Sequence, residues 1–325
     1  MPSTFAKRSA AGGVIIWLVT LLLTTSDSAP TELIHKILFF AVLVIVPLGL
    51  SVVDGQIRTS LYRLVVLAQP VAALLTIVSF FFDKGALSAA LASAWLILNI
   101  FVALYGAARL LSRKIHHLAE LSIDAGLLYL PVAGMWLVIY RLGIQPFGYG
   151  EIIILLTAVH FQFAGFATPI IAGMSGRVLS SPNYPRKVFA AVVFAVVAAM
   201  PLVAAGITFS PWIGFIGALL LTVGLLLLAG LTIGWVGPAI APARWRILLW
   251  IGALSSCAAM VLACLYAYSL ATHTLILTIP HMAMTHGLLN AFGFVTCNLF
   301  VWSKIEPPEL GDKKAPNAQK AELLS

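Results

Sequence analysis

Histidine, amide and hydroxyl side chains inside long apolar runs are the residues of this sequence with the clearest capacity for chemistry. His160 and Gln162 lie in LLTAVHFQFAGFATPIIAGMSGR, and Thr285, His286 and Asn290 lie in PHMAMTHGLLNAFGF. A polar side chain within an apolar run of membrane-spanning length is costly, so it marks a candidate functional site. We therefore predict that these five residues contribute to a ligand-binding site.

A second candidate group lies in the segment RKIHHLAELSID. His116, Glu120 and Asp124 recur at i, i+4 and i+8, which places them near one face of a helix. A tetrahedral metal site could use this spacing. The commoner arrangement is a solvated helix end whose charged side chains pair along the helix, and we favour that interpretation. We therefore assign no metal site to these residues.

The composition determines which elements must position these side chains. Hydrophobic residues make up 61% of the chain and charged residues 9%, against about 25% charged residues in an average soluble domain. This excludes a soluble globular protein and a disordered chain. We predict an all-α polytopic transmembrane helical bundle over residues 1–303 and a flexible cytoplasmic tail over 304–325. The ten expected helices are 11–26, 32–53, 61–82, 86–111, 122–142, 150–175, 187–208, 211–236, 246–271 and 278–303.

The distribution of basic residues predicts the orientation of this bundle. With the N-terminus inside, 16 of the 19 Lys and Arg residues fall in inner segments and 3 in outer segments. The positive-inside rule therefore predicts that both termini are cytoplasmic. The same residues form no basic stripe with interleaved aromatic residues, so we expect contact with the lipid bilayer and none with nucleic acid.

Depth in the membrane connects the two histidines. His160 lies about 14 Å from the outer end of the sixth predicted helix, and His286 about 12 Å from the outer end of the tenth, at about 1.5 Å per residue. His286, Asn290, Gly293 and Cys297 also recur at i, i+4, i+7 and i+11. Such a polar and small face is expected to contact protein or a cavity. We predict that His160 and His286 face one shared cavity.

Cysteines at positions 160 and 286, in a background without Cys257, Cys264 and Cys297, test this shared cavity. We expect a crosslinker of about 8–10 Å to join them, because packed helices lie about 8–10 Å apart. A cysteine pair on two adjacent helices is the control. If the control pair is crosslinked and the 160–286 pair is not, the two histidines lie in separate places.

Two histidines leave several kinds of chemistry open. They could ligate a b-type haem through both imidazoles, whereas a zinc or copper site would need three or four ligands. Hydrogen bonds to Gln162, Thr285 and Asn290 could also serve to hold helices together. A transporter is a further alternative, although no Lys, Asp or Glu lies in the middle of a predicted helix. Cofactors, catalytic residues and the question of enzymatic activity therefore stay unassigned.

Three stretches of the sequence resemble the YndJ-like family of bacterial membrane proteins. They are DAGLLYLPVAGMWLVIYRLG (124–143), TAVHFQFAGFATPIIAGMSGR (157–177) and THGLLNAFGF (285–294). The resemblance implies a multi-pass protein of the bacterial inner membrane, and it implies no particular reaction. We therefore expect a membrane protein of uncharacterised activity that binds a small molecule or lipid in an intramembrane pocket near His160 and His286.

Overall fold

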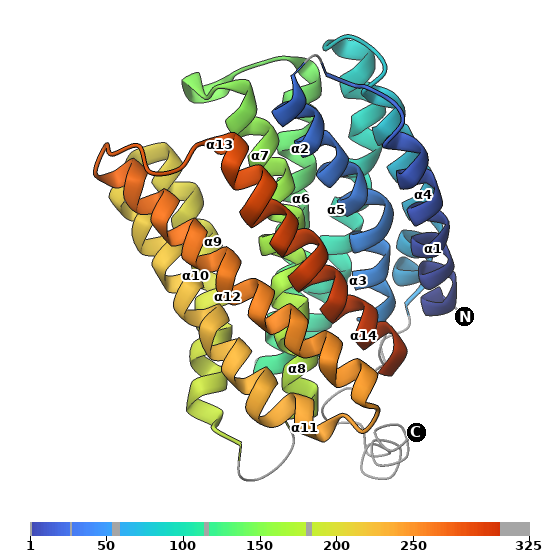
Figure 1. Ribbon diagram of the computed structural model, residues 1–325. Helices are drawn as coiled ribbons and strands as arrows, with labels where there is room; N and C mark the ends of the chain where they lie inside the picture. The colour runs from blue at the N-terminus through green and yellow to red at the C-terminus, as the bar shows by residue number, and fades with distance from the viewer. Residues whose placement is uncertain (1, 27, 54–58, 114–116, 180–183, 306–325) are drawn as a thin grey trace. The chain divides into compact units, whose positions relative to one another are not determined.

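The computed structural model describes residues 2–26, 28–53, 59–113, 117–179 and 184–305 (Figure 1). Within these ranges the regular elements are all helical. The ten successive segments are α1 (Pro2–Thr20), α2–η1–α3 (Ala29–Phe40, Ala41–Ile45, Val46–Val52), α4 (Ser60–Ser79), α5 (Ala86–Arg113), α6 (Leu118–Leu142), α7–η3–α8 (Glu151–His160, Phe161–Ala167, Thr168–Val178), α9 (Arg186–Phe209), α10–η4–α11 (Pro211–Leu231, Thr232–Val236, Gly237–Ala239), α12 (Ala243–Ala271) and α13–η5–η6–α14 (Ile279–Met282, Ala283–Gly287, Leu289–Thr296, Cys297–Ile305). A short 3₁₀ turn, η2 (Pro146–Gly148), precedes α7.

Nine of the described helical segments are long and apolar enough to cross a membrane. This confirms the predicted all-helical membrane fold, and the bounds of these nine segments lie close to the predicted ones. The last segment continues through Ile305, slightly beyond the predicted end of the membrane domain. Residues 306–325 of the predicted tail lie outside the described part of the chain.

The first helix is the exception among the ten. The sequence predicts it at 11–26, but α1 begins at Pro2 and ends at Thr20, and it is not one of the nine apolar segments. Its early start follows from packing that hydropathy does not reveal. Ala6 and Ala10 are buried, and the Ser9 hydroxyl donates to the Gln69 Oε1 atom of α4 at 2.7 Å.

The chain divides into two compact units. Unit 1 comprises Met1–Lys114 and Asp124–Ala167, and unit 2 comprises Ile115–Ile123 and Thr168–Ser325. The first turns of α6 and the whole of α8 therefore belong to unit 2, whereas the rest of α6, α7 and η3 belong to unit 1. In unit 1, α1 packs against η1, α3 and α4, and α4 packs against α5.

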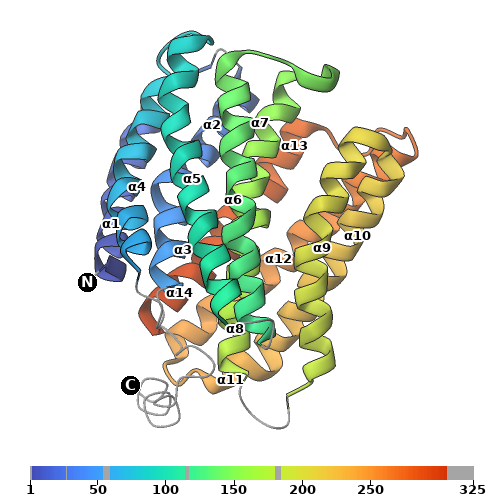
Figure 2. The same cartoon turned by 180° about the vertical axis from the view of Figure 1, so that it is seen from behind.

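Unit 2 is organised around α10, which packs between α9 and α12. Figures 1 and 2 both show these three helices side by side. The α9–α10 contact is close: a Cβ atom at Gly206 would lie 2.1 Å from the Cα atom of Gly214. Small residues allow backbones in a membrane to approach in this way, which strengthens van der Waals packing between helices. The last membrane-spanning segment packs against α12 through η6 and α14.

Four membrane-spanning segments contain π-helical turns at η1, η3, η4 and the η5–η6 stretch. These turns are rare and frequently lie at functional sites. The turn η3 starts directly after His160 and contains Gln162, and the η5–η6 stretch contains His286 and Asn290. In a π-helix, residue i is hydrogen-bonded to residue i+5. Residues that would share one face of a regular α-helix are therefore rotated relative to one another across such a turn.

Candidate functional site

His286 and Asn290 lie about one turn apart on the last membrane-spanning segment, on a face that contacts α12. The His286 Nδ1 atom lies 2.8 Å from the Ala259 carbonyl oxygen of α12. A Cβ atom at Gly293 would lie 2.4 Å from the Ser255 Oγ atom of the same helix. The polar and small face predicted for this segment thus contacts protein at both positions.

The contacts of His286 define how its ring is protonated. A carbonyl oxygen can only accept a hydrogen bond, so Nδ1 carries the proton that is donated to Ala259. In a neutral imidazole, Nε2 is then an acceptor. The Asn290 Nδ2 atom lies 3.2 Å from Nε2 and 3.3 Å from Nδ1, so it lies against the ring and is not aligned with a single nitrogen. The pair therefore places an amide N–H group against the imidazole of His286.

In the Asn290 carboxamide, the nitrogen forms hydrogen bonds and the oxygen accepts none from the described residues. Its Nδ2 atom lies 3.0 Å from the main-chain oxygen of His286, which requires the nitrogen and not the oxygen to point there. No described residue donates a hydrogen bond to Oδ1, and the side chain is half-buried. Asn290 therefore leaves an open acceptor inside a membrane-spanning segment.

Thr285 and the nearby His281 form hydrogen bonds with residues three or four positions away in the chain. Thr285 is exposed, and its hydroxyl donates to the main-chain oxygen of His281 at 2.6 Å. The His281 Nδ1 atom lies 2.9 Å from the Thr278 hydroxyl oxygen. The structure thus places Asn290 beside His286. The Thr285 hydroxyl instead bonds to the main chain of its own segment.

In unit 1, His160 and Gln162 lie in different surroundings although they are two residues apart. His160 is exposed, and its Nδ1 donates to the Leu156 main-chain oxygen at 2.7 Å. The Gln162 side chain is fully buried, and its Nε2 lies 3.4 Å from the Ala158 oxygen. Its Oε1 has no donor among the described residues. Gln162 therefore repeats the arrangement of Asn290, in which the amide nitrogen faces the carbonyl four residues earlier and the amide oxygen stays open.

The two histidines belong to different units. His160 is part of unit 1 and His286 part of unit 2. The cavity that the sequence predicts them to share therefore stays a prediction.

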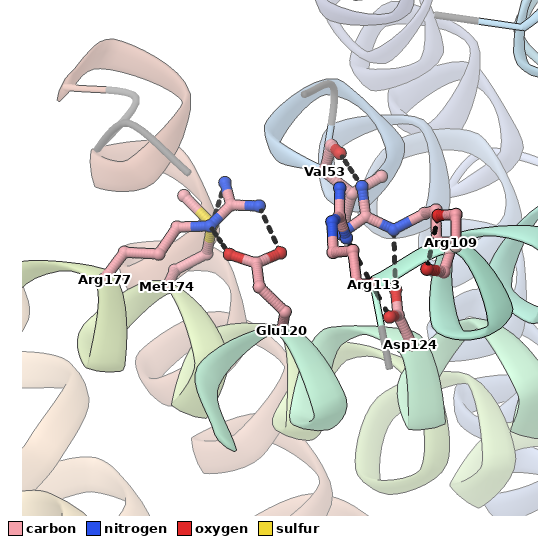
Figure 3. A network of polar contacts seen from close by, with 8 residues as sticks. Val53, Arg109, Arg113, Glu120, Asp124, Met174 and Arg177 are labelled. Atoms are coloured by element: carbon pink, nitrogen blue, oxygen red, sulfur yellow. Dashed lines mark hydrogen bonds and ion pairs between the residues drawn. The ribbon is translucent and has the colours of Figure 1, made fainter. Parts of the chain in front are cut away.

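At the start of α6, Glu120 forms a buried ion pair with Arg177 of α8 (Figure 3). The Arg177 Nε and Nη2 atoms donate to the two carboxylate oxygens of Glu120 at 2.7 and 2.9 Å. Both side chains are nearly inaccessible, with 2% exposure each. The parallel two-bond geometry is typical of the strongest arginine–carboxylate contacts.

One turn later, Asp124 pairs with arginines of α5 in unit 1 (Figure 3). The Arg109 Nε atom donates to the Asp124 Oδ1 atom at 2.6 Å, and its Nη1 atom donates to the Val53 oxygen at 2.9 Å. An Arg113 nitrogen lies 3.9 Å from the other carboxylate oxygen. Arg109 and Asp124 are both fully buried.

These ion pairs correct the interpretation of the second candidate group. Glu120 and Asp124 were expected at a solvated helix end, but arginines from neighbouring helices cover both carboxylates and exclude water. The third member, His116, lies outside the described residues. Among the residues that the structure describes, no three His, Cys, Asp or Glu side chains are grouped to hold a metal ion.

A further polar network was missed by the sequence reasoning. In unit 1 the buried His35 ring lies between two hydroxyls, with Nδ1 2.9 Å from Thr25 Oγ1 and Nε2 2.8 Å from the Tyr140 hydroxyl. Thr25 also donates to Glu32, which forms an ion pair with Lys36 at 2.5 Å. The i, i+4 spacing of Glu32 and Lys36 around His35 was the signal available for finding this network.

Comparison with known proteins identifies the family of this chain. The family described as "YndJ-like protein" matches residues 36–294. The chain is 30% identical over 236 residues to a Bacillus subtilis (strain 168) protein named "Uncharacterized membrane protein YndJ". The match covers 72% of this chain and 41% of that relative. No solved structure matches the chain.

Proposed function

The chain belongs to the YndJ-like family of membrane proteins, and from that premise we propose that it binds a small molecule or lipid inside the membrane. The proposed contacts are the acceptor groups near His286 in unit 2 and those near His160 in unit 1. The name of the relative specifies a membrane protein and no ligand, so the proposal depends on the geometry of these residues.

The open carboxamide oxygen of Asn290 is the observation that carries this proposal. A polar group removed from water without a hydrogen-bond partner destabilises a protein by roughly 1–3 kcal/mol by mutational measures. The lipid around a membrane-spanning segment offers no donors in the hydrocarbon region. A bound molecule that donates to Oδ1 would remove this cost. The fully buried Oε1 atom of Gln162 supports a second contact of the same kind.

The chemistry of the open Asn290 oxygen restricts the ligand class. Oδ1 is an acceptor, and the described part of unit 2 contains no acidic residue other than Glu120. It would therefore bind a hydroxyl or N–H group on an otherwise apolar molecule. The neighbouring Gly293 leaves room for close helix packing but contributes no polar group.

Replacing Asn290 with leucine tests the proposal by removing the open acceptor while keeping a similar volume. In protein purified with its native lipids, we expect Asn290→Leu to reduce a co-purifying molecule, measured by mass spectrometry, about tenfold. The estimate follows from losing one hydrogen bond worth about 1–1.5 kcal/mol.

Met284→Leu is the matched control, because Met284 is an apolar residue on the same segment and is 61% exposed. We expect this variant to retain the molecule, and melting curves of both variants would show that each is folded. Equal amounts of every co-purifying molecule in Asn290→Leu and wild type would contradict the proposal.

Two alternatives predict different readouts from the same preparation. A b-type haem would give a Soret absorption band that disappears in both His160→Ala and His286→Ala. A transporter would move the bound molecule across the bilayer of proteoliposomes, which binding alone does not do. The first result would favour redox chemistry over binding alone, and the second would favour transport.

A further inference from the structure

Cations and aromatic rings are grouped where α12 begins and α14 ends in unit 2. The rings of Trp245 and Phe300 have centroids 5.8 Å apart. The Arg244 guanidinium lies 4.9 Å from the centroid of Trp245, and the Lys304 ammonium lies 5.3 Å from that of Phe300. Two cations are therefore held on adjoining aromatic rings at one end of two packed membrane-spanning segments.

Arg246, two residues after Arg244, lies against a different ring. Its guanidinium lies 5.5 Å from the centroid of Trp250, and residues i and i+2 of a helix do not face each other. Arg244 and Lys304 are exposed. The group therefore consists of two accessible cations on adjoining rings.

The described part of unit 2 contains no carboxylate that neutralises these cations. Its one acidic residue is Glu120, and both oxygens of that side chain accept from Arg177. Arg244 and Arg246 also lie in the first turn of α12, where the helix dipole favours negative charge. An anion at this place would therefore be stabilised by Arg244, Lys304 and the helix terminus.

We propose that Arg244 and Lys304 bind the phosphate group of an anionic phospholipid. The ends of two membrane-spanning segments lie at headgroup level, where aromatic residues are typical. Basic groups between helices on the cytoplasmic side recognise such headgroups, and the positive-inside distribution predicts that side here. Phe300 is 40% exposed, so its ring can contact the lipid below the phosphate.

This site is separate from the proposed ligand contacts at His286. Lys304 and His286 lie on the same segment, roughly 27 Å apart at about 1.5 Å per residue. The His286→Ala variant is therefore expected to bind anionic lipid as wild type does. The two proposals can therefore fail independently. A variant can lose the co-purifying ligand and keep its lipid binding, or it can lose lipid binding and keep the ligand.

The test titrates delipidated full-length protein with phosphatidylglycerol and counts bound lipids by native mass spectrometry. We expect the double variant Arg244→Gln/Lys304→Gln to bind about 30-fold more weakly than wild type. This follows from about 1 kcal/mol for each basic residue near an anionic headgroup. Phosphatidylcholine, which carries no net charge, should bind both proteins equally weakly.

The control removes the same number of charges elsewhere on the predicted cytoplasmic side, by Arg186→Gln/Lys187→Gln. We expect its phosphatidylglycerol affinity to stay within about threefold of wild type, because these residues do not belong to the cluster. Equal loss in the two double variants would show that net charge alone attracts lipid, and no loss in either would show that the cluster binds none. Displacement of the lipid by millimolar inorganic phosphate would identify a site for free phosphate instead. Each of these outcomes would overturn the proposal.

Discussion

Replacing Arg177 with leucine is expected to lower the free energy of unfolding by about 3–5 kcal/mol, because it leaves the Glu120 carboxylate buried without its cation. Both oxygens of Glu120 accept from Arg177, and both side chains are almost completely inaccessible. An unpaired carboxylate there has no water to solvate it. Unfolding in mixed detergent micelles with increasing sodium dodecyl sulfate would measure the loss.

The double variant Glu120→Leu/Arg177→Leu is the decisive control for this ion pair. Removing both charges leaves no unpaired group, and buried ion pairs replaced by apolar residues are often as stable as the original. We therefore expect the double variant to be more stable than Arg177→Leu. If the double variant loses as much stability as the single variant or more, the large effect does not come from an unpaired buried charge.

Replacing Asp124 with alanine is expected to produce a similarly large loss, about 3–5 kcal/mol, in the unfolding free energy. Asp124 accepts from Arg109 at 2.6 Å, and the Arg109 side chain is fully buried. Without the carboxylate, Arg109 would keep its bond to the Val53 carbonyl but lose its counter-charge. Thermal melting or detergent unfolding would measure the effect.

Arg113→Ala provides the matched comparison for Asp124→Ala. The Arg113 nitrogen lies 3.9 Å from the carboxylate, and its side chain is 14% exposed, so its contribution to the pair is weaker. We expect a loss below about 1 kcal/mol, as for ion pairs that water can screen. An equal loss in Arg113→Ala and Asp124→Ala would show that the two arginines share the charge of Asp124 equally.

These stability predictions and the binding prediction for Asn290 have separate readouts. The buried ion pairs have satisfied partners, so their variants should change unfolding. Asn290 has an open acceptor, so its variant should change what the protein binds with little change in unfolding. A variant that changes both would indicate that binding and packing are coupled at that residue.

The positions of the membrane-spanning helices could be predicted from the sequence because lipid imposes a simple requirement on the chain. Each segment needs about 20 mainly apolar residues, and its backbone must form its hydrogen bonds internally. Nine segments meet this requirement where the hydropathy of the sequence predicts them. The start of α1 could not be found in this way, because a partly buried hydrogen bond between Ser9 and Gln69 helps to position it.

Part of the candidate site could be predicted in the same manner. The polar and small face of the last segment follows from spacing, and the contacts of His286 and Gly293 with α12 agree with it. The π-helical turns at η3 and η5–η6 could not be predicted, because the period of the helix there depends on side chains packed from other segments. His160 and Gln162 therefore differ in burial in a way that their sequence spacing did not reveal.

The sequence by itself determined that the protein lies in lipid, that it is helical and which segments can cross the membrane, since these properties depend on local composition. Only the tertiary structure decided which charges are buried. Glu120 pairs with an arginine 57 positions away, and Asp124 with one 15 positions away. Neither partner is marked by local spacing, because an ion pair between helices depends on where the chain folds back. The same physical reason explains why Arg244 and Lys304, distant in sequence, lie on adjoining aromatic rings.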